Sequence, residues 1–328
     1  MTKVMRELVE YNGITMCPYE KVPYFTQLNV DNIFCIQPEK PDIDRIVSVY
    51  AQASITDSKL ISTVKGTSLE GQGLTGYDVM ICGEISLKIE YIECESCDSC
   101  ECNVPINTTE SKFSFYGSVV LPQNININAT ITPSVAIEDI LSEKMDLRCI
   151  YNNITIMLIA DISSSSNDLN VKIDNCSQNL FPIMPTYFKQ QMVCENINLD
   201  PKRLDIERVI DVSVWPEISN IKLIDTAIGV SNEGQRLSGF ALVVEVNLKE
   251  KITYIACEPT QMTQVNYCQN SSIINVVVPD EVNIKDINSL MSVGRISVTP
   301  YVEGIKFKKL DNKTINLCVM LLVDVKVC

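Results

Sequence analysis

The chain has 328 residues, of which 46% are hydrophobic and 21% are charged, so it can bury real cores and is not a disordered polypeptide. Its formal net charge of −14 argues against nucleic acid or an anionic membrane as a partner, because both attract lysine and arginine. The absence of histidine removes the commonest general base, the commonest metal ligand and every Ser-His or Cys-His nucleophile pair. We therefore expect no enzyme, no catalytic residues and no cofactor.

No run of 18 apolar residues is present, so the sequence predicts no membrane span. The N-terminal stretch MTKVMRELVEYNG has no apolar core and no small-residue cleavage site, so we expect synthesis in the cytosol without a signal peptide. The chain nevertheless carries 14 cysteines, an unusual number for a protein that remains in a reducing compartment.

Strand-like segments dominate the first half of the chain. Residues 80–92 alternate apolar and polar side chains over their second half, which is typical of a strand with one buried face. Residues 113–121 and 154–162 are further β-branched or aromatic runs. Short helices are predicted at 6–11 and 136–145.

The second half follows the same pattern. Residues 242–246 and 251–255 alternate like strands, and 317–327 is a long β-branched run. One further short helix is predicted at 284–291.

An internal duplication explains this similarity. The stretch from Lys59 to Cys94 aligns without a gap with the stretch from Lys222 to Cys257 at an offset of 163 (222 − 59 = 163). The same offset relates Tyr24-Phe25-x-Gln27 to Tyr187-Phe188-x-Gln190. We predict an all-β fold of two tandem β-sandwich-like domains with minor helix, residues 1–162 and 163–328, joined at the polar run Ser163–Asp168.

A glycine-rich stretch, Gly71-Gln-Gly73-Leu-Thr-Gly76, matches the dinucleotide-binding pattern in letters only. That fingerprint needs a helix after the glycines, whereas a strand follows here. The second copy carries the bulky Arg236 where the first has Gly73. We therefore predict a tight turn or a bulge that enters the strand.

Other polar candidates favour ordinary structural roles. Asp42 with Asp44, or Asp161 with Asp324, could form a general acid/base pair, but exposed charge and turn chemistry are the favoured interpretation. The single tryptophan, Trp215, fits either an interface anchor or a partly buried strand residue.

The cysteines offer the most specific chemistry. Four of them, Cys94, Cys97, Cys100 and Cys102, follow the long strand of the first copy. Three interpretations are open: disulfide cross-linking, a Cys₄ metal or iron–sulfur site, and an inert cluster. The interleaved acidic residues and the lack of a second closely spaced pair favour cross-linking over metal.

The matching loop of the second copy holds only Cys257 and Cys268, which could close it as a disulfide. Cys17 and Cys328 lie near the chain ends and join the cross-link candidates. Cys82 and Cys318 lie within strands and are expected to be buried as small hydrophobic side chains.

Three phrases resemble a known family. They are Lys40–Ile46, Cys82–Tyr91, and Phe113-x-Phe115 leading to Val119-Val-Leu-Pro122. They are similar to the SPOCS domain of cysteine-rich spore coat and exosporium proteins of clostridial spore-formers, and the resemblance covers both copies. The second copy departs from it at Val246, which replaces the glycine found at position 83.

The resemblance implies a structural spore-surface protein, synthesised in the mother cell cytosol, that self-assembles into an ordered lattice or filament cross-linked by disulfides. Its partners would be copies of itself and other coat or exosporium proteins. Two alternatives stay open: a non-enzymatic adaptor in spore morphogenesis, and a metal-binding protein built on the cysteine cluster.

Overall fold

The computed structural model describes the chain in eight segments: residues 2–6, 8–15, 22–94, 105–125, 129–163, 181–279, 291 and 294–327. The chain forms two compact units. Unit 1 comprises residues 1–59 and 79–171, and unit 2 comprises residues 60–78 and 172–328. The expected boundary at 162/163 lies near the one at 171/172. The assignment of residues 60–78 to unit 2 was not anticipated from the sequence.

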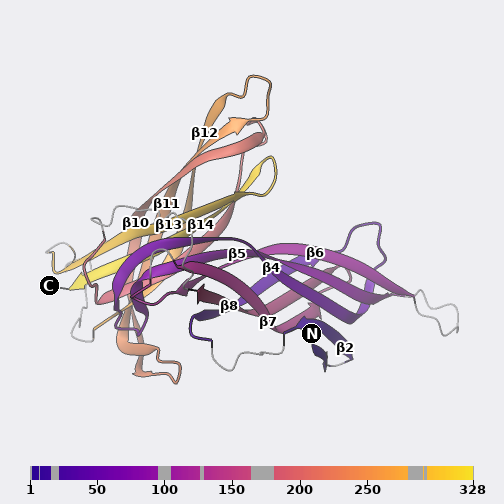
Figure 1. The fold of residues 1–328 in the computed structure, drawn as a ribbon, viewed down its shortest axis with the longest axis horizontal. Coiled ribbons are helices and arrows are strands. Elements are labelled where there is room, and N and C mark those ends of the chain that lie inside the picture. Colours follow the sequence, from indigo (N-terminus) through magenta and orange to yellow (C-terminus); the bar gives the residue numbers. More distant parts are fainter. Residues whose placement is uncertain are drawn as a thin grey trace. The chain divides into compact units, whose positions relative to one another are not determined.

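Unit 1 is built from two sheets (Figure 1). The five-stranded sheet contains β1 (Thr2–Arg6), β2 (Val9–Ile14), β4 (Ile43–Thr67), β5 (Gly73–Glu93) and β6 (Ile106–Val120), in that order. The three-stranded sheet has the order β3 (Phe25–Cys35), β8 (Cys149–Ser163) and β7 (Thr130–Lys144).

Unit 2 also contains two sheets, each with three strands. One contains β10 (Ile206–Val230), β11 (Arg236–Ala256) and β12 (Thr263–Val278). The other has the order β13 (Ile296–Lys309), β14 (Thr314–Val327) and β9 (Tyr187–Asn198). The two long hairpins, β4–β5 and β10–β11, are visible in Figure 1 as extended ribbon pairs.

The core of unit 2 follows directly from strand periodicity. Successive side chains of a strand point to opposite faces, so every second residue of β11 and of β14 faces inward. The inward rows of the two strands belong to one buried apolar cluster: Leu242, Val244, Val246, Leu248, Ile252 and Tyr254 from β11, and Leu317, Val319, Leu321 and Val323 from β14. The two sheets therefore form a β-sandwich, and the predicted all-β class is confirmed.

Two of the three expected helices are wrong. Residues 6–11 span the end of β1 and the start of β2, and residues 136–144 belong to β7. β7 pairs with β8 along its full length, from Thr130 to Lys144. The free energy of this pairing outweighs the weak local helix preference of a short segment. The third expected helix, 284–291, lies outside the described residues except for Met291.

The hairpin end formed by residues 60–78, hereafter arm 1, is part of unit 2. Its turn is closed by Ser68, whose backbone amide donates to the carbonyl of Gln72 at 2.8 Å and whose hydroxyl accepts from the amide of Gln72 at 3.0 Å. Gly71 has a φ of +103° in this turn, a backbone conformation that favours glycine. The predicted tight turn is therefore confirmed, and it lies at the tip of a hairpin.

Arm 1 is hydrogen-bonded to edge strand β9. The side-chain amide of Gln72 donates to the carbonyl of Gln190 at 3.0 Å, and its oxygen accepts from the amide of Gln190 at 2.8 Å. The amide of Leu69 donates to the carbonyl of Thr186 at 3.0 Å. Lys189 forms an ion pair with Glu70 at 2.9 Å. Arm 1 thereby satisfies backbone groups that an edge strand would otherwise leave open.

A buried glutamate completes the contact. Glu303 forms a β-bulge between Val302 and Gly304, and its carboxylate accepts from the backbone amide of Val64 at 2.8 Å and from the side chain of Gln190 at 2.7 Å. Val64 is 3% exposed and Glu303 is 2% exposed. Burial raises the pKa of Glu303 to about 7, against the opposing effect of the two hydrogen bonds.

Asp78, at the base of arm 1, is a second buried acid in this contact. It is fully buried, and neither carboxylate oxygen accepts a hydrogen bond within the described part of the chain. Burial, reinforced by the nearby Glu303, raises the pKa of Asp78 from 3.8 to about 8; the neighbouring Gln190 favours the ionised form too weakly to reverse this. Asp78 is therefore largely protonated in the folded protein at neutral pH.

We predict that Asp78→Asn stabilises the protein at pH 8 but not at pH 4. Between about pH 4 and about pH 8 the folded protein binds more protons at Asp78 than the unfolded chain, so stability falls as the pH rises through this window. Asparagine removes this loss, and we expect a gain of roughly 1 kcal/mol or more at pH 8. Thermal unfolding at both pH values measures it, with the exposed Asp44→Asn as the control. An equal loss of stability at both pH values would contradict the prediction.

Candidate functional site

Among the residues that the structure describes, each unit contains one disulfide, and it joins an edge strand to its central neighbour. Cys35 of β3 is bonded to Cys149 of β8, and Cys194 of β9 is bonded to Cys318 of β14. In both cases the two cysteines are direct partners in the antiparallel register. The expectation that Cys318 is a simple buried hydrophobic side chain is therefore wrong. Cys82, in contrast, is a buried thiol, as expected.

The pairing of β3 with β8 is equivalent to that of β9 with β14, but the two disulfides lie at different residue pairs of these pairings. The register of β3 with β8 matches that of β9 with β14 at offsets of 163 for the edge strand and 165 for the central strand (190 − 27 = 163; 322 − 157 = 165). Where unit 2 has its disulfide, unit 1 has a hydrogen bond of 2.7 Å from Asn153 to Asp31. Where unit 1 has its disulfide, unit 2 has a hydrogen bond of 3.0 Å from Thr314 to Asn198.

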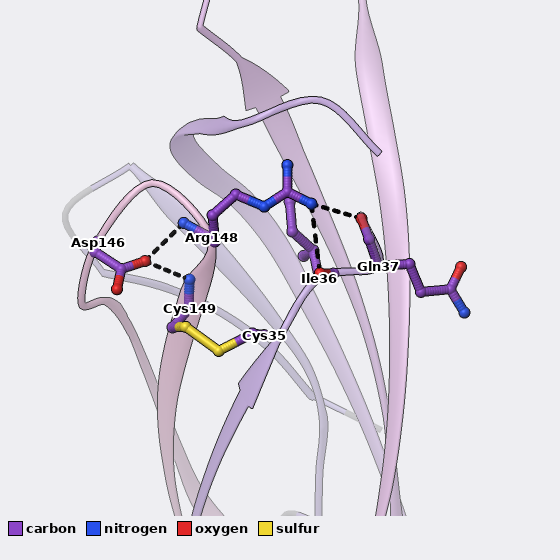
Figure 2. The surroundings of a disulfide bond; sticks show 6 residues. All are labelled: Cys35, Ile36, Gln37, Asp146, Arg148 and Cys149. Atoms are coloured by element: carbon purple, nitrogen blue, oxygen red, sulfur yellow. Dashed lines mark hydrogen bonds between the residues drawn. A yellow bond between two sulfur atoms is a disulfide. The ribbon is translucent and has the colours of Figure 1, made fainter. Parts of the chain in front are cut away.

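The disulfide of unit 1 lies beside a turn that Asp146 organises (Figure 2). The carboxylate of Asp146 accepts from the backbone amides of Arg148 and Cys149, each at 2.7 Å, which lowers its pKa. The guanidinium of Arg148 donates to the carbonyl of Gln37 at 2.6 Å and to Asp42 at 2.8 Å. Both chain segments next to the disulfide are thus held by polar contacts.

Two exposed thiols lie at matching positions of the sequence repeat. Cys94 follows β5, and its amide donates to the carbonyl of Asp42 at 3.0 Å. Cys257 follows β11, and its amide donates to the carbonyl of Asp205 at 2.8 Å. The positions are related by the offset of 163 (257 − 94 = 163). A solvent-exposed thiol can become a thiolate and attack a disulfide or an oxidant.

Cys268 has a different environment from Cys257, and the two do not form the loop-closing disulfide that the sequence suggested. The thiol of Cys268 is partly buried and donates to the carboxylate of Glu250 at 3.0 Å. Burial, followed by this hydrogen bond and the charge of Glu250, raises the pKa of Cys268. Its thiol therefore stays protonated, which makes it a poor nucleophile.

Glu250 is an acid in an apolar row. It faces inward on β11, between Leu248 and Ile252, and is 1% exposed. Glu195 lies beside it, and burial together with Glu250 raises the pKa of Glu195. Asn270 donates to Glu195 at 2.5 Å. This polar cluster was not predicted from the sequence, although a glutamate within an alternating apolar row is a signal for it.

The remaining cysteine candidates, Cys17, Cys97, Cys100, Cys102 and Cys328, lie outside the described residues. In the part of the chain that the structure describes, no group of three or more cysteines, aspartates or glutamates is placed to hold a metal ion. No helix among these residues is long and apolar enough to cross a membrane.

The other polar candidates have different surroundings. Asp42 is bound to Arg148, and Asp44 is exposed. Asp161 is exposed in unit 1, whereas Asp324 is 2% exposed in unit 2. Trp215 lies on β10 and is half exposed.

A cavity of about 520 Å³ in unit 1 has a mixed apolar and charged lining. Its lining residues include Leu8, Val9, Ile46, Asp44, Arg45 and Lys144. These side chains offer no activated nucleophile with an adjacent base, so the cavity does not suggest a catalytic mechanism.

No family model matches the chain, and no curated protein matches it. One solved structure, described as a lipopolysaccharide binding protein, covers 92% of both chains at 8% identity, with a TM-score of 0.13.

We predict that loss of the Cys194–Cys318 disulfide destabilises the protein by ~2–4 kcal/mol, because the bond restricts the unfolded chain over a sequence separation of 124 residues. The variant is Cys194→Ser/Cys318→Ser, and denaturant unfolding of alkylated protein measures the change. Asn153→Ala, at the equivalent position of unit 1, serves as the comparison and should lower the free energy of unfolding by ~1 kcal/mol. Equal stability of the disulfide variant and the unmodified chain would contradict the prediction.

We also predict that the thiols differ in reactivity. Iodoacetamide should modify Cys94 and Cys257 at pH 7.5 at least ~10-fold faster than Cys268, because alkylation proceeds through the thiolate. Glu250→Gln should accelerate the modification of Cys268, since it removes the carboxylate that holds the thiol proton. Peptide mass spectrometry over time gives all the rates. Equal rates for Cys257 and Cys268 would show that the burial and hydrogen bond of Cys268 do not protect it.

Proposed function

We propose that this protein is a structural subunit of a spore surface layer, either exosporium or coat, which self-assembles into an ordered lattice or filament and is then cross-linked by disulfides. The sequence phrases that resemble the SPOCS domain support the setting. The all-β sandwich architecture and its disulfides support the structural role, because cross-strand bonds make each unit resistant to unfolding.

The observation that carries the proposal is the pair of exposed thiols, Cys94 and Cys257. Each sits at the end of a long strand, on a backbone fixed by a hydrogen bond to the start of the preceding strand. The described residues offer neither of them a sulfur partner. A thiol that is exposed and held at a fixed place can form a bond between subunits once their Cα atoms approach within roughly 4.4–6.8 Å.

The proposed order of events follows from redox chemistry. The chain is synthesised in the mother cell cytosol, where thiols stay reduced and subunits can find their lattice positions reversibly. Oxidation follows when the mother cell fails and the layer meets air. Two thiols then form one disulfide and transfer two electrons and two protons to molecular oxygen, the oxidant. Other coat or exosporium proteins are further proposed partners, and the same thiols could join them.

We predict that Cys257→Ser shortens the ladder of covalent oligomers that oxidised protein gives on a non-reducing gel. Cys268→Ser is the matched control and should leave the ladder unchanged, because the thiol of Cys268 is protected by Glu250. Electron microscopy of the same samples with and without reductant tests whether an ordered array precedes the cross-links. A monomer band that is unaffected by oxidant and reductant, together with discrete single particles, would overturn the proposal in favour of a monomeric adaptor.

A further inference from the structure

The chain contains two hairpin tips of the same construction. Arm 2, residues 223–241, is the end of β10–β11 and corresponds to arm 1 at the offset of 163 (223 − 60 = 163). In its turn the amide of Ser231 donates to the carbonyl of Gln235 at 2.8 Å, and its hydroxyl accepts from the amide of Gln235 at 3.1 Å. Gly234 has a φ of +90°. These contacts repeat those of Ser68, Gln72 and Gly71 in arm 1.

The chain also contains two versions of the surface that receives arm 1. We define socket 2 as Phe188, Gln190 and Glu303 with the carbonyl of Thr186, and socket 1 as Phe25, Gln27 and Glu138 with the carbonyl of Pro23. In socket 2 the side chain of Gln190 donates to Glu303 at 2.7 Å, and in socket 1 the side chain of Gln27 donates to Glu138 at 2.5 Å.

The two glutamates occupy the same place in their sheets. Glu138 is the bulged residue after Ile137, which pairs with Ile156. Glu303 is the bulged residue after Val302, which pairs with Leu321. The offsets agree (303 − 138 = 165; 321 − 156 = 165). Both sheets therefore have a bulge with an acidic side chain at the same register. A bulge changes the direction of a side chain at one position, so the two glutamates are positioned in the same way.

Arm 1 and socket 2 are joined within unit 2, as the exposure of their residues shows. Phe188 is 1% exposed and Gly66 of arm 1 lies against its ring, whereas Phe25 is 53% exposed. Likewise, Val64 of arm 1 is buried, and its counterpart in arm 2, Ala227, is exposed. Arm 2 and socket 1 therefore present matching surfaces to solvent.

The backbone of socket 1 is open for the same hydrogen bonds. β3 is the edge strand of its sheet. The backbone carbonyl of Tyr24 accepts from the amide of Ala160, so the backbone amide and carbonyl of Tyr24 point into the sheet. Backbone amides and carbonyls alternate in direction along an antiparallel edge strand, so those of Phe25 and Gln27 point away from the sheet. Gln235 can bind the backbone of Gln27 as Gln72 binds that of Gln190.

We infer that arm 2 of one molecule docks in socket 1 of a second copy of this chain, in the way that arm 1 docks in socket 2 within each molecule. The inference rests on the proposed self-assembly and specifies its contact, but it needs neither the spore setting nor any sulfur bond. The contact is heterologous, since an arm meets a socket rather than another arm. Such contacts join molecules head to tail into rings or open filaments.

Docking requires one exchange of partners. In the single chain the side chain of Gln235 donates to Glu70 at 2.9 Å, and the amide of Arg236 donates to the carbonyl of Glu70 at 2.7 Å. Both of these arm 2 residues are exposed. Release of Gln235 from Glu70 costs one exposed hydrogen bond, and docking replaces it with two to the backbone of Gln27.

Two variants test the contact. A donor-deficient variant, Ala227→Asp/Gln235→Ala, removes the side chain that bonds the edge strand and places a carboxylate against Glu138. An acceptor-deficient variant, Phe25→Asp/Glu138→Ala, alters socket 1. The matched control is Ile228→Asp, because its counterpart Lys65 stays exposed in the docked arm 1. Exposed thiols are alkylated beforehand, and sedimentation velocity measures the size of each species.

The unmodified chain and the control should form head-to-tail oligomers, whereas each variant alone should associate at least ~10-fold more weakly. Mixing the two variants should give one-to-one dimers that grow no further, since each supplies the part that the other lacks. Circular dichroism checks that both variants are folded. Variants that assemble like the unmodified chain, or a mixture that stays monomeric, would overturn the inference.

The outcome also separates this inference from the proposed function. If the alkylated unmodified chain stays monomeric while the untreated chain still forms a covalent ladder, the arm–socket contact is wrong and the cross-linked assembly remains. If the untreated chain is monomeric as well, both are wrong.

Discussion

The open edge of a three-stranded sheet is the constraint on which this structure depends. β3 and β9 are edge strands, and every second residue of an edge strand points its amide and carbonyl away from the sheet. In unit 2 the hairpin tip at residues 60–78 satisfies these groups through Gln72 and Leu69. This contact is specific, because the side-chain carboxamide of Gln72 binds the backbone amide and carbonyl of a single residue, Gln190.

The bulged glutamate makes the same contact selective. The buried carboxylate of Glu303 accepts from the backbone amide of Val64 in the arm and from the side chain of Gln190. A buried carboxylate without such donors would be costly, so a hairpin that could not present an amide there would be rejected. Selection by buried polar groups suits the proposed assembly, in which a socket accepts one partner among many copies of similar sheets.

At equivalent positions of the two units, a disulfide in one unit is replaced by a hydrogen bond between side chains in the other. Asp31 and Asn153 form a hydrogen-bonded pair in unit 1 at the position of the unit 2 disulfide. Asn198 and Thr314 form such a pair in unit 2 at the position of the unit 1 disulfide. Both disulfides tie the edge strand that forms a socket to its central neighbour. This keeps the strands of each socket in register, whereas the exposed Cys94 and Cys257 remain available for the proposed bonds between molecules.

The alternation of apolar and polar residues, the gapless repeat at an offset of 163 and the tip glycines were readable from the sequence, because each depends only on local spacing. The strand at 80–92 and the turn at Gly71 were predicted on this basis. Residues 136–145 were not, because a short segment next to a central strand takes its conformation from that strand rather than from its own propensity.

Tertiary structure alone decided which cysteines meet and which hairpin docks. Cys194 and Cys318 are 124 residues apart, and only the register of β9 on β14 makes them neighbours. The protonated thiol of Cys268 depends on Glu250, 18 residues away on the adjacent strand. The sequence shows two similar arms and, at the same offset, two Tyr-Phe-x-Gln segments. That one arm is buried and the other exposed is a property of long-range packing, which no local pattern encodes.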